Sequence, residues 1–250
     1  MNEQTEAANI LSTLAQLNNP RDYQELHWEG SFVGYLKLVR ESPRVTRNAF
    51  QRIYDMVISY GTEEYTEHKK KIVRYKFFRD GQHGGRDAVY GIDQSLNHLV
   101  DTFKAAARNY GTGGRGVLLH GPVGSAKSTI VRLLKKGLEE YSRTPDGAMY
   151  TFGWTNVTRE IEKEMYQVTN DELVCPMRED PLHLLPTEQR NEFLAKVMQG
   201  GSNPNYAVQI EGDLCPSCRQ MYRDLTRRYK GEWMKVMEHI RVHRFLLSEK

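Results

Sequence analysis

The chain of 250 residues has few cysteines, no long apolar stretch and little net charge. Its 3 cysteines are an odd number, which excludes a fully paired disulfide framework and leaves buried thiols or metal ligands. No apolar run approaches the roughly 20 residues that a membrane helix needs, and the opening MNEQTEAANI lacks the basic and apolar regions of a signal peptide. The formal net charge is only +3, so the composition calls for neither nucleic acid nor an anionic membrane as partner. A cytoplasmic protein without a membrane partner is predicted.

Turn signals and apolar spacing divide the chain into parts. Residues 1–24 are polar and are predicted to form a flexible tail. Residues 25–85 are predicted to form a helical subdomain, because apolar residues recur at helical spacing on both sides of Pro43 before the short strand-like run IVRYKFF. Residues 86–250 are predicted to form a partial nucleotide-binding domain, for the reasons that follow.

Residues 86–250 begin with the elements of an α/β fold. A helix from Asp93 leads to the apolar segment GVLLH, which is predicted to be a strand. A glycine-rich loop, the helical stripe TIVRLLKKGLEEY and a second strand, AMYTFGW at 148–154, come next. Strand, loop, helix and strand in this order are typical of the repeating unit of a parallel sheet.

The segment RGVLLHGPVGSAKSTIVRLLKKG matches a phosphate-binding loop at all but one required position. The Walker A pattern is glycine, about four free positions, glycine, lysine and then serine or threonine. Gly121, Lys127 and Ser128 satisfy it, whereas Ala126 stands in place of the second glycine. Because the loop follows an apolar segment and opens a helix, its backbone N–H groups and the helix N-terminus can face a phosphate. The alternative is an ordinary strand-to-helix turn with an incidental lysine.

The loop residues have expected roles in binding Mg-ATP. Lys127 is expected to contact the β and γ phosphates, and the Ser128 hydroxyl to coordinate Mg²⁺. Gly124 is expected where a side chain would obstruct the phosphate or where φ is positive. Ala126 is expected at the helix entrance with a negative φ, where its methyl group can be accommodated. The predicted phosphate-loop residues are Gly121, Pro122, Val123, Gly124, Ser125, Ala126, Lys127, Ser128 and Thr129.

A second part of the nucleotide site is predicted in the segment VYGID. The backbone of Tyr90, Gly91 and Ile92 is expected to line an adenine pocket. In the alternative interpretation, the segment only begins a helix, and Asp93 caps the helix QSLNHLV. Both can hold, since the cap concerns Asp93 and the pocket concerns the residues before it.

Several segments in order resemble the PrkA-type bacterial serine protein kinases, which carry an N-terminal AAA+ ATPase domain. They are HWEGSFVGYL, VYGIDQSLNHLV, GPVGSAKSTIVRLLKKGLE, CPMREDPLHLLP and HIRVHRFLLSEK. The resemblance implies an incomplete AAA+ P-loop NTPase core with a parallel sheet, which binds ATP and Mg²⁺ and whose residues 90–92 border adenine. It also implies a serine/threonine kinase, the remainder of a larger protein as partner, and a homo-oligomer of the full-length form.

The printed residues lack the catalytic motifs that the resemblance implies. AAA+ catalysis needs a Walker B carboxylate pair, and the nearest candidate, YAVQIEGD at 206–213, has no adjacent acidic pair. The kinase motifs HRD and DFG are also missing. We therefore expect a fragment that ends before the Walker B strand and binds nucleotide without hydrolysing it. The alternative is a nucleotide-independent interaction module with a relic loop; nucleic-acid binding through HKKKIVRYKFF is the least favoured interpretation.

The cysteines are candidates for a structural zinc site. Cys215 and Cys218, in CPSC, have the spacing of a zinc knuckle, and Cys175 is the candidate third ligand. The candidate fourth ligands are His183, His239 and His243. The last two are expected on one face of a helix, MEHIRVHRFLL. The alternative is reduced cysteines in a turn without a metal.

Overall fold

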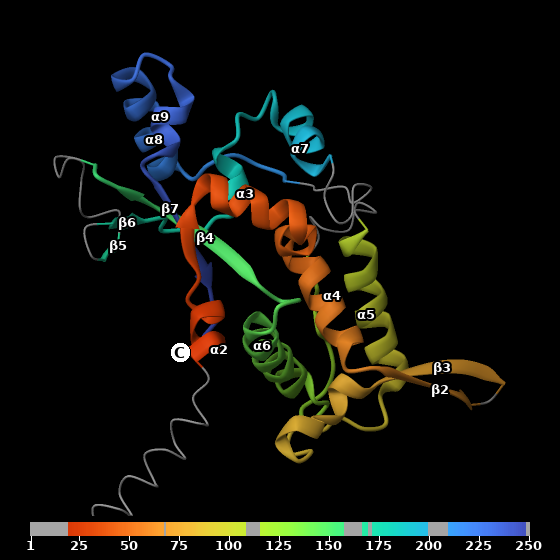
Figure 1. The fold of residues 1–250 in the computed structure, drawn as a ribbon. Coiled ribbons are helices and arrows are strands. Elements are labelled where there is room, and N and C mark those ends of the chain that lie inside the picture. Colours follow the sequence, from red (N-terminus) through yellow and green to blue (C-terminus); the bar gives the residue numbers. More distant parts are fainter. Residues whose placement is uncertain are drawn as a thin grey trace, which may run out of the picture. The chain divides into compact units, whose positions relative to one another are not determined.

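The computed structural model describes residues 20–67, 69–108, 116–157, 167–169, 172–199 and 210–248 (Figure 1). The chain divides into two compact units, each assembled from separate segments. The described residues of unit 1 come from Met1–Leu38, Tyr150–Phe193 and Gly212–Phe245, and those of unit 2 come from Val39–Met149, Leu194–Glu211 and Leu246–Lys250. The boundaries predicted after residues 24 and 85 do not coincide with these limits, and that division stays a prediction.

Unit 1 is built on a 5-stranded sheet with the strand order β1-β7-β4-β6-β5. The strands are β1 (Glu29–Ser31), β4 (Met149–Thr155), β5 (Gln167–Thr169), β6 (Glu172–Val174) and β7 (Ile240–Phe245). The pairs β1–β7, β4–β6 and β5–β6 are all antiparallel. The predicted strand at residues 148–154 is confirmed as β4, but the predicted parallel arrangement is not found in these pairs.

Strand β7 replaces a helix that the sequence pattern predicted for MEHIRVHRFLL. The short helix α9 (Trp233–Met237) ends before it, and Ile240–Phe245 pairs with β1 through Gly30 opposite Val242. Ile240 and Val242 are buried while Arg241 between them is exposed. This alternation is typical of a strand, so the helix prediction for these residues is wrong.

Helices surround the core of unit 1. Within it, the side chains of Phe152 and Trp154 on β4 and Met221 on α8 (Pro216–Arg228) are fully buried. The central residues of β4 are all buried, which indicates that both faces of this strand are covered. The remaining helices that begin in unit 1 are α2 (Pro20–Leu26), α3 (Phe32–Glu41), the 3₁₀ helix η5 (Pro181–Leu184) and α7 (Arg190–Met198).

Unit 2 consists of helices and a hairpin. Its α-helices are α4 (Ala49–Ser59), α5 (Asp93–Ala107) and α6 (Lys127–Arg143). Its 3₁₀ helices are η1 (Pro43–Thr46), η2 (Lys76–Arg79) and η3 (Gly81–His83). The antiparallel hairpin joins β2 (Thr62–Glu67) to β3 (Lys70–Tyr75). The predicted helices on either side of Pro43, and those containing Leu96 and Leu133, are therefore confirmed.

One hydrophobic core joins the elements of unit 2. Its buried residues include Met56 on α4, Phe77 on η2, Val100 on α5 and Leu133 on α6. A side chain at Gly137 of α6 would meet Phe77 Cε2 at 2.5 Å, so glycine is what permits this close packing. Ile130 near the start of α6 belongs to the same core, which therefore supports the helix where the glycine-rich loop ends.

The surface offers no membrane-spanning element within the described ranges, since none of their helices has the length and apolar character that spanning needs.

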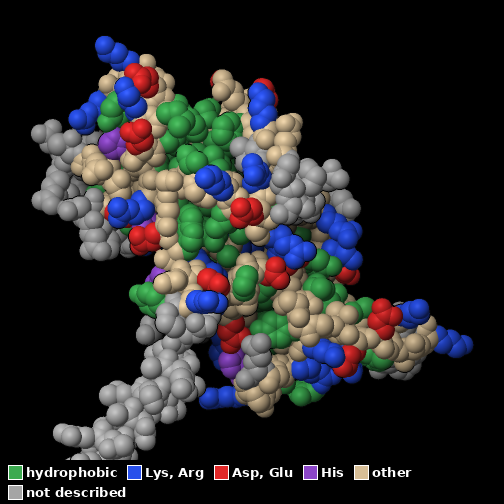
Figure 2. All heavy atoms as spheres, in the orientation of Figure 1, with side chains coloured by type: hydrophobic (Ala, Val, Ile, Leu, Met, Phe, Trp, Pro, Cys, Tyr) green, Lys and Arg blue, Asp and Glu red, His purple; other side chains and the backbone are tan. Residues whose placement is uncertain are grey.

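Figure 2 shows Lys and Arg side chains at the protruding end of the β2–β3 hairpin. Lys69 in the turn and Lys71 on β3 are exposed, whereas Ile72 of β3 is buried. Lys69 and Lys71 thus lie at the surface of the hairpin.

Candidate functional site

The glycine-rich loop leads directly into α6, whose first residue is Lys127. Gly124 has a φ of +82°, as predicted for a position that favours glycine. Ala126 has a φ of +57°, so the predicted negative φ is wrong. A left-handed backbone costs a residue with a Cβ about 1–2 kcal/mol. Position 126 therefore has the backbone conformation that suits the glycine of the Walker A pattern, and alanine occupies it under strain.

Replacing Ala126 with glycine is expected to change nucleotide affinity by less than about threefold. The loop offers backbone donors that the methyl group does not remove, so affinity is expected to stay nearly the same. In the free energy of unfolding, the relief of strain is offset by the greater freedom of glycine in the unfolded chain, about 0.4–1 kcal/mol. Ala126→Val is the matched control, because a β-branched residue is an outlier at positive φ and is expected to weaken both stability and binding. Isothermal titration with ATP and ADP compares the affinities of the parent and the two variants. A large gain in affinity in the glycine variant would show that the methyl group obstructs the site.

Residues 116–120, which precede the loop, do not form the predicted strand. Leu118 is 86% exposed and Val117 is 47% exposed, so these side chains lie outside the core. A strand requires a neighbour that satisfies its backbone hydrogen bonds, and an apolar pattern alone does not supply one. The strand prediction for GVLLH is therefore wrong for this structure.

Lys127 folds back over the loop. Its Nζ donates hydrogen bonds to the carbonyl oxygens of Gly121 at 2.7 Å and Pro122 at 2.6 Å, and to Ser125 Oγ at 3.0 Å. The ammonium group is thus held among oxygen acceptors at the mouth of the loop. Phosphate oxygens are acceptors of the same kind with a full negative charge, so they can compete for this position. Ser128 is exposed in the first turn of α6.

A cavity of about 870 Å³ lies beside the loop in unit 2. Its walls come from α5, from residues 116–122 and from the start of α6. The volume falls within the range of roughly 300–1,000 Å³ that is usual for small-molecule sites. Its polar side chains are Gln94, Ser95, His98, Thr102, His120, Ser125 and Lys127. No aspartate or glutamate of the described ranges lines it.

The segment VYGID contributes to this cavity through one of its residues. Ile92 lines the cavity, whereas Tyr90 is 65% exposed and lies under the guanidinium of Arg79 at 4.3 Å from its ring centre. Asp93 is the first residue of α5 and not its cap, because Ile92 occupies that position. Asp93 Oδ2 instead accepts hydrogen bonds from the Tyr65 hydroxyl at 2.8 Å and from Arg74. The capping prediction is wrong: Asp93 joins α5 to the hairpin.

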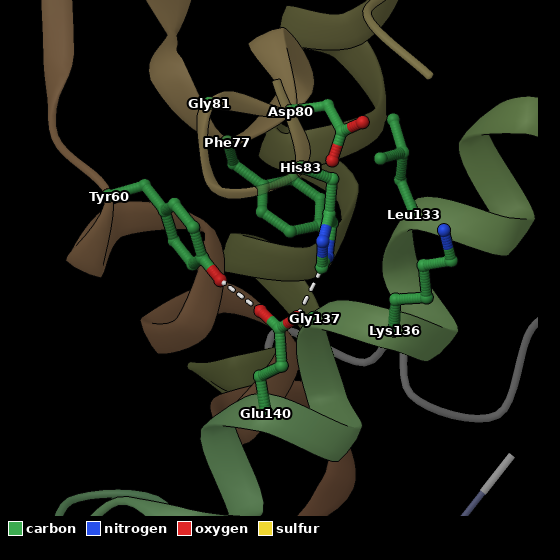
Figure 3. A pocket seen from close by; sticks show the side chains of 9 residues that line it. All are labelled: Tyr60, Phe77, Asp80, Gly81, His83, Leu133, Lys136, Gly137 and Glu140. Atoms are coloured by element: carbon green, nitrogen blue, oxygen red, sulfur yellow. Dashed lines mark hydrogen bonds and ion pairs between the residues drawn. The ribbon is translucent and has the colours of Figure 1, made fainter. Parts of the chain in front are cut away.

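Unit 2 contains a second, smaller pocket, drawn in Figure 3. Glu140 of α6 occupies it, accepting a hydrogen bond from the Tyr60 hydroxyl at 3.2 Å and pairing with His83 Nε2 at 2.8 Å. Burial and the adjacent Glu140 carboxylate raise the pKa of Tyr60 to about 12. Since the polar groups at the centre of this pocket bind one another, we assign no ligand to it.

The three cysteines come together in unit 1 with a fourth group that the sequence pattern did not indicate. The Sγ atoms of Cys175, Cys215 and Cys218 and a carboxylate oxygen of Glu179 all lie within 4.8 Å of one another. All three cysteines are buried and free of disulfides. We call these four residues the cysteine cluster. Glu179 follows Cys175 in CPMRE, and that spacing is the only sequence signal that could have identified it.

The thiols of the cysteine cluster have unequal pKa values. A hydrogen bond from Cys218 lowers the pKa of Cys175, and the same bond raises the pKa of Cys218. Burial raises the pKa of Cys215 to about 11. Cys175 is thus the thiol of this group that loses its proton most readily.

The predicted histidine ligands do not join the cysteine cluster. His239 bonds the Thr155 carbonyl oxygen through Nδ1 and the Tyr229 hydroxyl through Nε2, each at 2.8 Å. His243 Nε2 lies 2.6 Å from Oε1 of Glu172, and this hydrogen bond raises the pKa of His243. The remaining candidate, His183, contacts the carbonyl oxygen of Asp180 through Nδ1. None of the three belongs to the metal-ligand group found among the described residues.

The weak Walker B candidate at residues 206–213 lies partly outside the described residues, which resume at residue 210. Residues 210–213 contain no strand, and Asp213 pairs with Arg219 at 3.3 Å. The described part of this segment, residues 210–213, therefore holds no carboxylate pair at the end of a strand.

Comparison with known proteins identifies the family to which the chain is similar. The PrkA AAA domain family matches residues 30–250. The ATP-dependent protease PrkA of Bacillus subtilis (strain 168) is 34% identical over 227 residues, which are 90% of this chain and 28% of that protein. An uncharacterised protein in the gldA 5′ region of Geobacillus stearothermophilus is 32% identical over 94 residues, or 37% of this chain and 86% of that protein.

No solved structure matches the chain. The chain spans 28% of the length of the Bacillus relative. The family match covers nearly the whole chain and includes the loop, the cavity and the cysteine cluster. The chain belongs to the PrkA AAA domain family, and it is a nucleotide-binding AAA module of a PrkA-type protein.

Proposed function

We propose that this chain binds Mg-ATP and Mg-ADP at residues 121–129 and does not hydrolyse ATP by itself. The observation that carries the proposal is the cavity of about 870 Å³ that adjoins the N-terminus of α6 and contains Lys127. The helix N-terminus favours a negative phosphate, and the ammonium group adds a charge-assisted contact. In this proposal Ser128, exposed in the first turn, coordinates Mg²⁺, and the cavity beyond Ile92 receives the base.

The absence of turnover follows from the chemistry of the cavity wall. Phosphoryl transfer at a P-loop needs a carboxylate near Mg²⁺, a residue that orients the attacking water and a cation that stabilises the transition state. No acidic side chain lines the cavity among the described residues, and Lys127 is already committed to ground-state binding. Groups that bind substrate and transition state equally give affinity without rate.

The chain is therefore expected to release no phosphate from ATP beyond the level of its Lys127→Ala variant, which controls for contaminating ATPases. A continuous phosphate-release assay at saturating Mg-ATP measures this over many possible turnovers per chain. Repeated turnover that disappears in the variant would contradict the proposal and would show that a catalytic carboxylate acts from outside the cavity wall described here.

In a longer PrkA-type protein, we propose that the nucleotide state of this module acts on the remainder of the chain. The Bacillus relative is named an ATP-dependent protease, which is consistent with such coupling. The serine/threonine kinase activity implied by the resemblance has no motif in these residues and stays a prediction, as do a homo-oligomer of the full-length form and a cytoplasmic location.

A further inference from the structure

We propose that the cysteine cluster is a structural zinc site whose ligands are Cys175, Cys215, Cys218 and Glu179. The ligand atoms lie within 4.8 Å of one another, and Cys175 Sγ lies 3.4 Å from Glu179 Oε2. Ligands at Zn–S and Zn–O distances of about 2.3 and 2.0–2.2 Å occupy tetrahedral corners roughly 3.5–3.8 Å apart. Closing the group around one ion requires only small side-chain rotations.

The chain supplies the ligands from two turns that begin alike. Cys175 comes directly after β6 and is followed by Pro176, and Cys215 precedes α8 and is followed by Pro216. In the first turn Arg178 adopts a φ of +52° and donates its N–H to the Cys175 carbonyl oxygen at 3.1 Å. This tight turn brings Glu179 back beside Cys175. In the second segment, Cys215 caps α8 and Cys218 lies in the first turn of that helix, so both thiols are near the helix N-terminus.

Hydrogen-bond donors are aimed at the sulfur atoms, as metal-bound thiolates require. The indole Nε1 of Trp154, which is fully buried on β4, donates to Cys218 Sγ at 3.4 Å. Backbone N–H groups of Met177 and Glu179 face the sulfur of Cys175, and that of Cys218 faces the sulfur of Cys215. Such donors spread the negative charge of a zinc-thiolate centre and orient its ligands.

Zinc suits this donor set better than the other common occupants. Thiolates favour zinc, and a site closed by four protein ligands is typical of a structural ion. An iron–sulfur cluster would hold the cysteine sulfurs farther apart, because iron and sulfide atoms lie between them. On binding, Zn–S bonds replace S–H bonds and the thiol protons pass to solvent. The ion then joins the turn after β6 to the start of α8, two segments distant in sequence.

The test begins with the 250-residue chain purified under reducing conditions without a chelator. Elemental analysis is expected to find close to one zinc per chain, and removal of the zinc is expected to lower the midpoint of thermal unfolding. Refilling the metal-free chain with Co²⁺ is expected to give the d–d bands of tetrahedral cobalt and the charge-transfer band of several thiolates. Less than half an equivalent of zinc together with no thiolate–cobalt band would overturn the proposal, and so would iron with acid-labile sulfide.

A substitution at Glu179 tests the fourth ligand while all three thiols stay in place. Glu179→Gln is expected to keep the thiolate–cobalt band but to weaken Co²⁺ affinity by at least the roughly 10–100-fold that loss of an outer-shell partner costs. Glu188→Gln, an exposed carboxylate outside the cysteine cluster, is the matched control and is expected to bind Co²⁺ as the parent does. Unchanged affinity in Glu179→Gln would overturn the assignment of Glu179. Because the main readouts use the unaltered chain, misfolding of a cysteine variant cannot obscure the result.

Discussion

Replacing Lys127 with alanine is expected to weaken ATP and ADP binding by about one to two powers of ten. A charge-assisted hydrogen bond contributes roughly 1.5–3 kcal/mol, and each 1.4 kcal/mol is about tenfold in affinity. In the free chain the Lys127 ammonium group contacts Gly121 and Pro122, acceptors that phosphate oxygens would replace. Titration calorimetry of the variant with Mg-ATP and Mg-ADP measures the loss directly.

The control for this substitution is Lys135→Ala on the same helix. Lys135 is exposed and does not line the cavity beside the loop, so its removal is expected to leave affinity unchanged. Thermal unfolding of both variants without nucleotide shows whether the loop loses order when Lys127 no longer bonds to it. If the Lys127 variant bound nucleotide as tightly as the parent, the phosphate assignment would be wrong. If the parent bound no nucleotide at all, the interaction-module alternative would be favoured.

Replacing Arg52 with methionine is expected to destabilise the chain by at least about 3 kcal/mol. Arg52 of α4 is 7% exposed, and its guanidinium donates to the carbonyl oxygens of Arg47 at 3.0 Å, Gly147 at 3.1 Å and Ala148 at 2.9 Å. It also donates to the carbonyl oxygen of Val45. Methionine fills much of the volume but donates nothing, and each buried carbonyl left without a donor costs about 1–3 kcal/mol. Urea-induced unfolding measures the change in free energy.

Arg44→Met provides a matched control, because Arg44 links the same two segments at the surface. Its ion pair with Asp146, at 3.4 Å, has side chains that are 60% and 66% exposed. Exposed ion pairs contribute about 0–1 kcal/mol, so a small change is expected. Equal and small effects of both substitutions would contradict the structural role of Arg52. Loss of Arg52 is also expected to lower nucleotide affinity indirectly, since α6 begins at the loop and ends near the residues that Arg52 binds.

The helices of unit 2 and strand β4 follow from the order of apolar residues in the chain. In α5, Leu96, Leu99, Val100 and Phe103 share one buried face, as their spacing predicts. Helix α4 begins where Asn48 and Gln51 exchange side-chain and backbone hydrogen bonds at 2.9 Å, a local capping arrangement. These features depend on neighbours within one or two turns, and a local pattern is enough to predict them.

The cysteine cluster was only partly predictable. Cys175, Cys215 and Cys218 were candidates because cysteine is rare and the CPSC spacing suits a metal. Glu179 was not, because acidic residues are common and its spacing from Cys175 in CPMRE is the only sequence signal that distinguishes it. Its place beside the sulfur atoms depends on the backbone turn at Arg178 and on the approach of α8, a distant segment.

The amino-acid order alone was sufficient for the family resemblance, for the position of the glycine-rich loop and for the helix that follows it. It could not decide the direction of the strands, the strand at residues 240–245 or the positive φ of Ala126. Strand direction depends on which distant segments exchange backbone hydrogen bonds. A short apolar run is compatible with either a strand or a helix. The conformation of Ala126 depends on how the core of unit 2 holds the start of α6 against the loop, so only the tertiary structure could place that alanine in the conformation of a glycine.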